Sequence, residues 1–73
     1  MTGVYKIDFN NIPTDQLQSH DKMMIEATIK VKEFSHLSMQ VWSAVLKELD
    51  KRGKVTLVSG SYDDIGNSLI HRL

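Results

Sequence analysis

The chain has 73 residues and no cysteine, and this combination limits how a domain of this size can be held together. A chain this short buries only about 60% of the surface that its unfolded form exposes, so its core supplies little stability. Without cysteine, neither disulfide bonds nor thiolate metal sites can compensate. Association with a second copy or with another protein is the remaining means of stabilisation. The short, cysteine-free sequence therefore favours the hypothesis that the chain associates.

The composition is typical of a folded globular protein and gives no sign of a membrane span or a secretion signal. Hydrophobic residues make up 41% of the sequence and charged residues 25%, which is ordinary for a globular domain. No apolar run approaches the roughly 18 residues of a membrane span, and the N-terminus lacks a signal-peptide pattern. We therefore expect a single small domain over residues 1–73 in the cytoplasm. The formal net charge of zero argues against autonomous nucleic-acid binding, which usually requires a clear positive excess.

Two segments in the first half of the chain alternate between apolar and other residues. Residues 4–9 ("VYKIDF") alternate, and residues 23–31 ("MMIEATIKV" from Met23) place apolar side chains at every second position. A period of two is typical of a half-buried strand, so both segments are predicted as strands. Between them Pro13 and two asparagines break the first strand, and only a short helical turn over residues 14–18 is expected.

The segment from Ser38 to Gly53 is predicted to be a helix. Its apolar residues fall within one stripe about 140° wide around the helix axis: Val41, Trp42, Val45, Leu46 and Leu49. Ser38 is placed to cap the N-terminus, and Gly53 can adopt the left-handed conformation that ends a helix. Trp42 is predicted to be a core residue, with an exposed aromatic anchor for a partner as the alternative.

Residues 54–59 ("KVTLVS") predict a short strand, and a final helix is expected from Ser61. Asp64 follows three residues after Ser61 and would complete a capping box. The buried stripe of this helix would contain four residues: Tyr62, Ile65, Leu69 and Leu73. Gly66 lies on the same side, and because an interior glycine costs about 1 kcal/mol relative to alanine, we expect another backbone to pack closely against it. The predicted fold is α+β, a small antiparallel or mixed sheet of about three strands packed with two α-helices, in the order β-β-α-β-α.

No residue pattern in the sequence indicates an enzyme. The three histidines, His20, His36 and His71, share no spacing that suits metal ligands. Asp63 and Asp64 would lie about 100° apart around a helix axis, so they cannot act as a pair on one group. A nucleophile elbow and a glycine-rich phosphate loop are also missing from the sequence. We therefore predict a non-enzymatic protein without a metal or cofactor.

Two groups of residues are candidate binding sites. The candidate partner-binding residues belong to the second predicted strand, whose alternation continues past residue 31 into "KEF": Met24, Lys30 and Lys32. Paired methionines can form an adaptable interface, and an open strand edge can accept another strand. The candidate nucleic-acid-binding residues form the densest basic cluster: Lys51, Arg52 and Lys54. This cluster would contact phosphates, or would instead be a solvated helix end that complements the helix dipole.

The stretch "LSMQVWSAVLKELDKRGKVTL", followed by "SYDDIGNSL", combines a capped helix, a basic turn, a short strand and the acidic start of a second helix. With Ile65, Gly66 and Leu69 at the apolar positions of that second helix, the segment from Leu37 to Leu69 resembles the first two helices of winged helix-turn-helix domains. The resemblance is greatest to those of plasmid and phage replication or regulatory proteins. It implies a DNA-binding protein whose next helix lies in the major groove. Since the sequence ends at Leu73 before such a helix, it further implies a fragment, a DNA reader kept for protein contacts, or a chance similarity of packing.

These observations support two functional hypotheses. The preferred one is a small, non-enzymatic regulatory or protein-interaction module, of phage or mobile-element type, that binds a partner protein or forms a homodimer. The alternative is a DNA-binding regulator or replication-protein domain of winged-helix type. The zero net charge favours the first hypothesis, and the basic cluster together with the resemblance favours the second.

Overall fold

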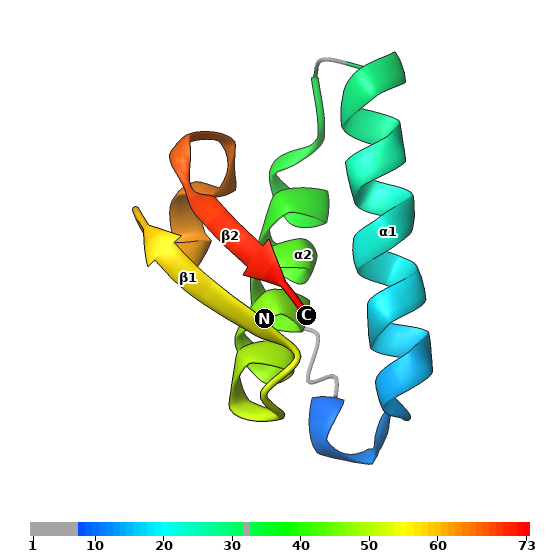
Figure 1. Cartoon of the computed structure of the whole chain (residues 1–73). Coiled ribbons are helices and arrows are strands. Elements are labelled where there is room, and N and C mark those ends of the chain that lie inside the picture. The colour runs from blue at the N-terminus through cyan, green and yellow to red at the C-terminus, as the bar shows by residue number, and fades with distance from the viewer. Residues whose placement is uncertain (1–7, 32) are drawn as a thin grey trace, which may run out of the picture.

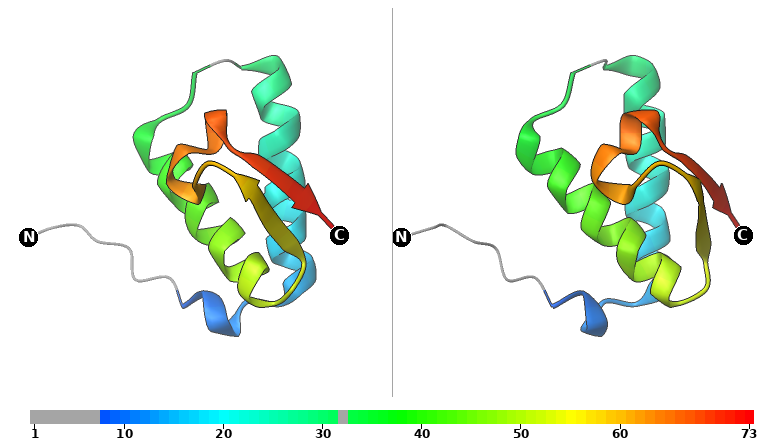
Figure 2. Two further views of the ribbon diagram at one scale, coloured as in Figure 1. Left: turned by 60° about the vertical axis from the view of Figure 1, so that its left-hand side comes forward. Right: turned by 90° about the vertical axis from the view of Figure 1, so that its left-hand side faces the viewer.

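A computed structural model of the chain describes residues 8–31 and 33–73, in which helices precede a two-stranded antiparallel sheet. The elements, in chain order, are η1 (Phe9–Asn11), α1 (Thr14–Lys30), α2 (His36–Lys51), β1 (Val55–Ser59), η2 (Tyr62–Asn67) and β2 (Leu69–Arg72). Helix α2 is the central element: α1 packs along one side of it, and β1 and η2 pack on another (Figure 1; Figure 2). Segment η1 is one 3₁₀ turn of three residues, and η2 consists of two 3₁₀ turns that meet at a kink at Asp64.

The structure is α+β with its main elements in the order α-α-β-β, so the predicted three-stranded sheet and the order β-β-α-β-α are wrong. Of the predicted strands, the one over residues 54–59 is found as β1, whereas residues 23–31 lie almost entirely in α1. The predicted strand over residues 4–9 lies mostly outside the described residues, and its last residue, Phe9, begins η1.

The sequence pattern of helix α1 is hard to recognise as helical because the buried face of the helix includes a carboxylate. Leu17 and Asp21 are buried, and Met24 and Ile25 are half-buried, at the spacing of one helix face. Because Asp21 is charged, it interrupts the apolar residues that repeat at helical spacing from Leu17 to Ile25. The alternation of apolar residues over 23–31 is then the stronger signal, and it predicts a strand. Most residues from Thr14 to Lys30 favour helix, and neither glycine nor proline occurs among them.

Helix α2 confirms the predicted helix and supplies most of the core. Within it, Trp42, Val45, Leu46 and Leu49 are at most 4% exposed. The buried apolar residues of the other elements close around these four: Leu17, Val55, Tyr62 and Ile65. The helix begins earlier than predicted, because Ser35 rather than Ser38 caps it: the Ser35 hydroxyl accepts a hydrogen bond from the Ser38 amide at 3.1 Å.

The predicted C-terminal helix is wrong, because the chain turns back at η2 and returns as β2. Leu57 pairs with Ile70 and Val55 with Arg72, with a register irregularity between Leu57 and Ser59. Ser61 makes no side-chain cap, so the expected capping box is absent from η2. Two residues of the expected buried stripe, Leu69 and Leu73, are 59% and 72% exposed. Three consecutive residues of lower helix propensity within the expected helix account for the difference: Gly66, Asn67 and Ser68.

Substitution with alanine should destabilise the protein at Gly60 but not at Gly66, the two glycines of the hairpin loop. Gly60 has φ +86°, and a Cβ there would lie 2.7 Å from Ser68 Oγ and 2.9 Å from Ser68 Cα. We therefore expect Gly60→Ala to lower the free energy of unfolding by about 1–3 kcal/mol, measured by denaturant titration. Gly66→Ala is the matched control, because nothing lies within 4 Å of a Cβ at that position. The close backbone approach that the sequence suggested for Gly66 is therefore wrong, and an equal loss in both variants would contradict this account.

Candidate functional site

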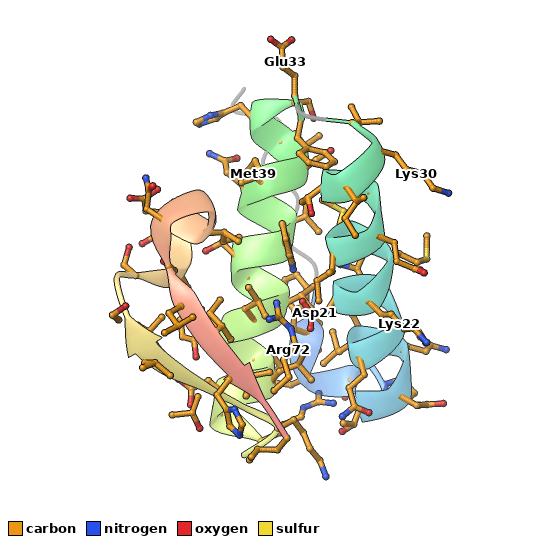
Figure 3. All side chains as sticks on the ribbon, turned by 45° about the horizontal axis from the view of Figure 1, so that its top comes forward. Asp21, Lys22, Lys30, Glu33, Met39 and Arg72 are labelled. Atoms are coloured by element: carbon orange, nitrogen blue, oxygen red, sulfur yellow. The ribbon has the colours of Figure 1, made fainter. Side chains whose placement is uncertain are left out.

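A buried carboxylate joins three elements of the fold. Asp21, in the middle of α1, is 4% exposed. Its Oδ1 accepts a hydrogen bond of 2.8 Å from the indole Nε1 of Trp42 in α2. The guanidinium of Arg72, near the end of β2, donates from Nε to Oδ2 at 2.6 Å and from Nη2 to Oδ1 at 2.9 Å. Figure 3 shows Asp21 and Arg72 pointing toward one another, with Lys22 extending outward from α1 beside them.

This arrangement supplies the carboxylate with the partners that a buried charge requires. An isolated carboxylate in an apolar core is strongly unfavourable, and a bidentate arginine together with a further donor compensates it. The side chain of Arg72 is 34% exposed, whereas that of Asp21 is 6% exposed. The cation therefore lies at the boundary between core and solvent, where its remaining donors can reach a ligand.

Sequence reasoning missed this cluster because its members are far apart in the chain. Arg72 lies 51 residues after Asp21, and Trp42 lies 21 residues after it. One signal was present in the sequence: Asp21 occupies the place of an apolar residue in the helical spacing that runs from Leu17 to Ile25. An acidic residue at a core position indicates a buried partner, although not which residue provides it.

A recess of about 250 Å³ lies beside the ion pair, between α1 and the base of the hairpin. We call it the α1–hairpin recess. Its apolar lining includes Ile25 from α1, Leu49 from α2 and Val55 from β1. The charged residues that line it are Asp21, Lys22, Lys54 and Arg72. The recess therefore combines an apolar floor with a cationic rim.

Of the predicted partner-binding residues, the structure describes Met24 and Lys30, and these two differ in their surroundings. Met24 is half-buried and packs against the core, whereas Lys30 is exposed at the last residue of α1. Lys32 lies outside the described residues. Because residues 23–30 are helical, Met24 and Lys30 are not on the shared outward face of a strand that the sequence suggested.

The predicted basic cluster separates into two exposed lysines and one engaged arginine. Lys51 and Lys54 are exposed, and Lys54 lines the α1–hairpin recess. Arg52 instead ties the start of the described chain to the end of α2. Its Nε lies 3.0 Å from Glu48 Oε2, its Nη1 donates to Thr14 Oγ1 at 3.0 Å, and its Nη2 donates to the Phe9 carbonyl at 2.8 Å.

Two further polar contacts attach η2 to α2 and shift pKa values. Burial, followed by the hydrogen bond that its hydroxyl donates to Asp50 Oδ2 at 3.0 Å, raises the pKa of Tyr62 from 10.0 to about 12. Hydrogen bonds from Lys47 at 2.9 Å and from Ser43 at 3.1 Å lower the pKa of Asp63 from its usual value. At neutral pH these hydrogen bonds of Tyr62 and Asp63 hold η2 against α2.

The raised pKa of Tyr62 predicts a loss of stability in alkali. Below pH 10 the hydroxyl is protonated in both states, but between pH 10 and about 12 only the folded state retains the proton. The contribution of this tyrosine is therefore present below pH 10 and lost as the pH rises through 12, by about 2–3 kcal/mol. Denaturant unfolding across this window should show a larger loss for the wild type than for Tyr62→Phe, and equal losses would count against the assignment.

Across residues 8–31 and 33–73, no group of three or more histidine, aspartate or glutamate side chains is placed to hold a metal ion. Neither α1 nor α2, the long helices of the described chain, is long and apolar enough to cross a membrane. Comparison of the chain with protein-family models, curated proteins and solved structures finds no significant match. The resemblance to winged helix-turn-helix domains therefore stays a prediction.

Proposed function

We propose that this chain is a small, non-enzymatic regulatory module, of phage or mobile-element type, that acts in the cytoplasm by binding a partner protein or a second copy. The observation that carries the proposal is the amount of apolar surface left uncovered. Among the described residues, eight apolar ones form the buried core. Seven large apolar side chains of the described residues are 46–77% exposed: Met23, Ile29, Val31, Leu37, Val58, Leu69 and Leu73.

Five of the exposed apolar side chains lie in two parts of the structure, namely the connection from α1 to α2 and the hairpin. Single exposed apolar side chains are normal, but concentrations of them mark interaction surfaces. Ile29, Val31 and Leu37 lie at the end of the molecule where α1 leads into α2, while Val58 and Leu69 lie on the hairpin (Figure 1). Covering such side chains would also add the stability that a core of this size lacks.

The hairpin offers a second means of association. Within the described part of the chain, β1 and β2 pair only with each other, so each has one edge without a strand beside it. Such an edge presents backbone donors and acceptors to an incoming strand. The exposed Val58 and Leu69 would extend the contact of that strand onto the sheet face.

Light scattering coupled to size-exclusion chromatography tests the proposal over a range of micromolar concentrations. We expect either a mass above the 8.3 kDa of one chain or a defined complex with an added binder. The variant Val58→Ser with Leu69→Ser removes apolar surface from the hairpin, and Met23→Ser with Ile29→Ser removes it from α1. One of the two pairs should weaken association without changing the unfolding midpoint of the monomer. A strictly monomeric chain that binds no peptide or protein would overturn the proposal.

The DNA-binding alternative is supported by the exposure of Lys51 and Lys54 near the end of α2. Phosphate-driven binding weakens steeply with salt, so duplex DNA should be tested at about 50 mM salt first. Lys51→Glu with Lys54→Glu is the informative variant, because Arg52→Glu would also break contacts to Thr14 and Phe9. Unchanged binding in that variant, or no binding at low salt, would remove the alternative.

A further inference from the structure

We propose that the α1–hairpin recess binds an acidic segment of a partner protein, which inserts one apolar side chain into the recess and places a carboxylate on Arg72. This inference rests on the proposed function, because it names one surface and one class of partner for a module that acts by binding. It differs from the apolar surfaces described above, because charge selects the occupant.

The size of the recess favours a single side chain. Small-molecule sites usually have volumes of about 300–1,000 Å³, whereas the recess has about 250 Å³. Its floor includes Leu49, which is fully buried, and Val55, which is 3% exposed, so the bottom is rigid and apolar. Ile25, which is half-buried on α1, forms part of the wall. An aliphatic or aromatic side chain of a peptide would cover the part of Ile25 that is still exposed.

The arginine beside the recess is held ready for a carboxylate. Asp21 engages Nε and Nη2 of Arg72, and within the described residues Nη1 makes no hydrogen bond. The buried carboxylate is itself oriented by Trp42, so the guanidinium plane is fixed before any ligand arrives. Preorganisation of this kind lowers the entropy lost on binding. A guanidinium recognises carboxylates through directed donors, which gives the site a preference for acidic ligands.

The charge around the recess favours the same class of ligand. Three cationic side chains line it, Lys22, Lys54 and Arg72, against the single carboxylate of Asp21. Neither lysine forms an ion pair with another described residue, whereas Asp21 is already engaged. The side chains of the whole sequence carry no net charge, so the excess of cationic side chains is a feature of the recess and not of the whole molecule. Acidic peptide side chains would complement it.

Selection from a random peptide library displayed on phage, with the full chain as bait, tests the proposal. Selected peptides should place aspartate or glutamate beside leucine, isoleucine or phenylalanine. The tightest of them, made synthetically, should bind about tenfold or more weakly to Lys22→Gln with Lys54→Gln. Its affinity should also fall as salt rises from about 50 mM, because the rim lysines are screened. Both lysines are exposed, so this variant should keep the wild-type unfolding midpoint.

Lys30→Gln with Lys51→Gln is the matched control, because it removes the same charge from two exposed lysines outside the recess. The control should bind the peptide as the wild type does, and amide NMR shifts caused by the peptide should centre on Lys22, Ile25 and Arg72. Neutral or basic selected peptides, or no selected peptide, would overturn the recess as an acidic-peptide site. Displacement of the peptide by an equal concentration of inorganic phosphate would also overturn it, since the recess would then be a simple anion site.

The two proposals fail in different ways in this experiment. Binding that is lost in the control but kept in the recess variant would overturn the recess and leave the interaction module standing on another surface. A second copy of the chain that competes with the peptide, shown by light scattering of the complex, would replace the foreign partner with a dimer. Failure of the proposed function itself requires that the chain neither self-associates nor binds any peptide.

Discussion

Replacement of Trp42 with alanine is expected to lower the free energy of unfolding by about 3–5 kcal/mol, the range for loss of a large buried aromatic side chain. Trp42 is 4% exposed and belongs to the core cluster on α2. Domains are stabilised by only about 0.05–0.15 kcal/mol per residue, which is about 4–11 kcal/mol for 73 residues, so the substitution removes a large fraction of the total stability. Far-UV circular dichroism during denaturant titration measures it, because the variant loses the only tryptophan.

Trp42→Phe separates packing from hydrogen bonding at the same position. Phenylalanine retains most of the apolar surface but cannot donate to Asp21, which accepts from the indole at 2.8 Å. Loss of a hydrogen bond to a charged group costs about 1.5–3 kcal/mol, so the phenylalanine variant should fall between wild type and alanine. An alanine variant with a native unfolding midpoint would show that the indole is not a core residue.

The second large effect is expected from Asp21→Ala, at about 2–4 kcal/mol. Removal of one partner of a buried ion pair usually costs about 3–5 kcal/mol, because the other charge loses its compensation. Arg72 is 34% exposed and can recover part of its hydration, which lowers the expected cost. Asp21→Asn should cost less than alanine, because the amide oxygen still accepts from Trp42. Thermal and denaturant unfolding of the three proteins at neutral pH tests this order.

A double-mutant cycle isolates the ion pair from the other contacts of its members. We expect Asp21→Ala and Arg72→Ala to be non-additive, because once one partner is absent the second substitution removes an already unpaired charge. The coupling energy should lie at about 1–3 kcal/mol, which is within the range for residues in contact. Additivity within about 0.5 kcal/mol would mean that the geometry of the pair contributes nothing to stability.

The sequence predicted those elements whose signals lie within the element itself. Helix α2 has an uninterrupted apolar stripe and a glycine at its end, and Gly53 indeed has φ +76°. Strand β1 was predicted from the apolar run after that glycine, and Trp42 was correctly assigned to the core. In each case local pattern and tertiary environment favour the same conformation.

The other elements depend on partners elsewhere in the chain. Helix α1 contains a charge in its buried stripe, which becomes favourable only when Arg72 and Trp42 are beside it. Residues 69–72 were predicted as helix and form a strand because β1 offers a pairing edge. The recess was missed for the same reason, since Lys22, Lys54 and Arg72 come from three separate segments. Of its lining, only Lys54 was among the residues predicted to bind a ligand.

The ion pair between α1 and β2 also has a consequence for the order of events during synthesis. Asp21 leaves the ribosome 51 residues before Arg72. At about 5–20 residues per second, roughly 1–4 s pass between the synthesis of Lys51, the last residue of α2, and that of the cation that compensates the carboxylate. Until then water must hydrate Asp21, so the two helices can associate only loosely on the ribosome. The hairpin is translated after both helices, and its arrival should convert that loose pair into the closed domain in one cooperative step.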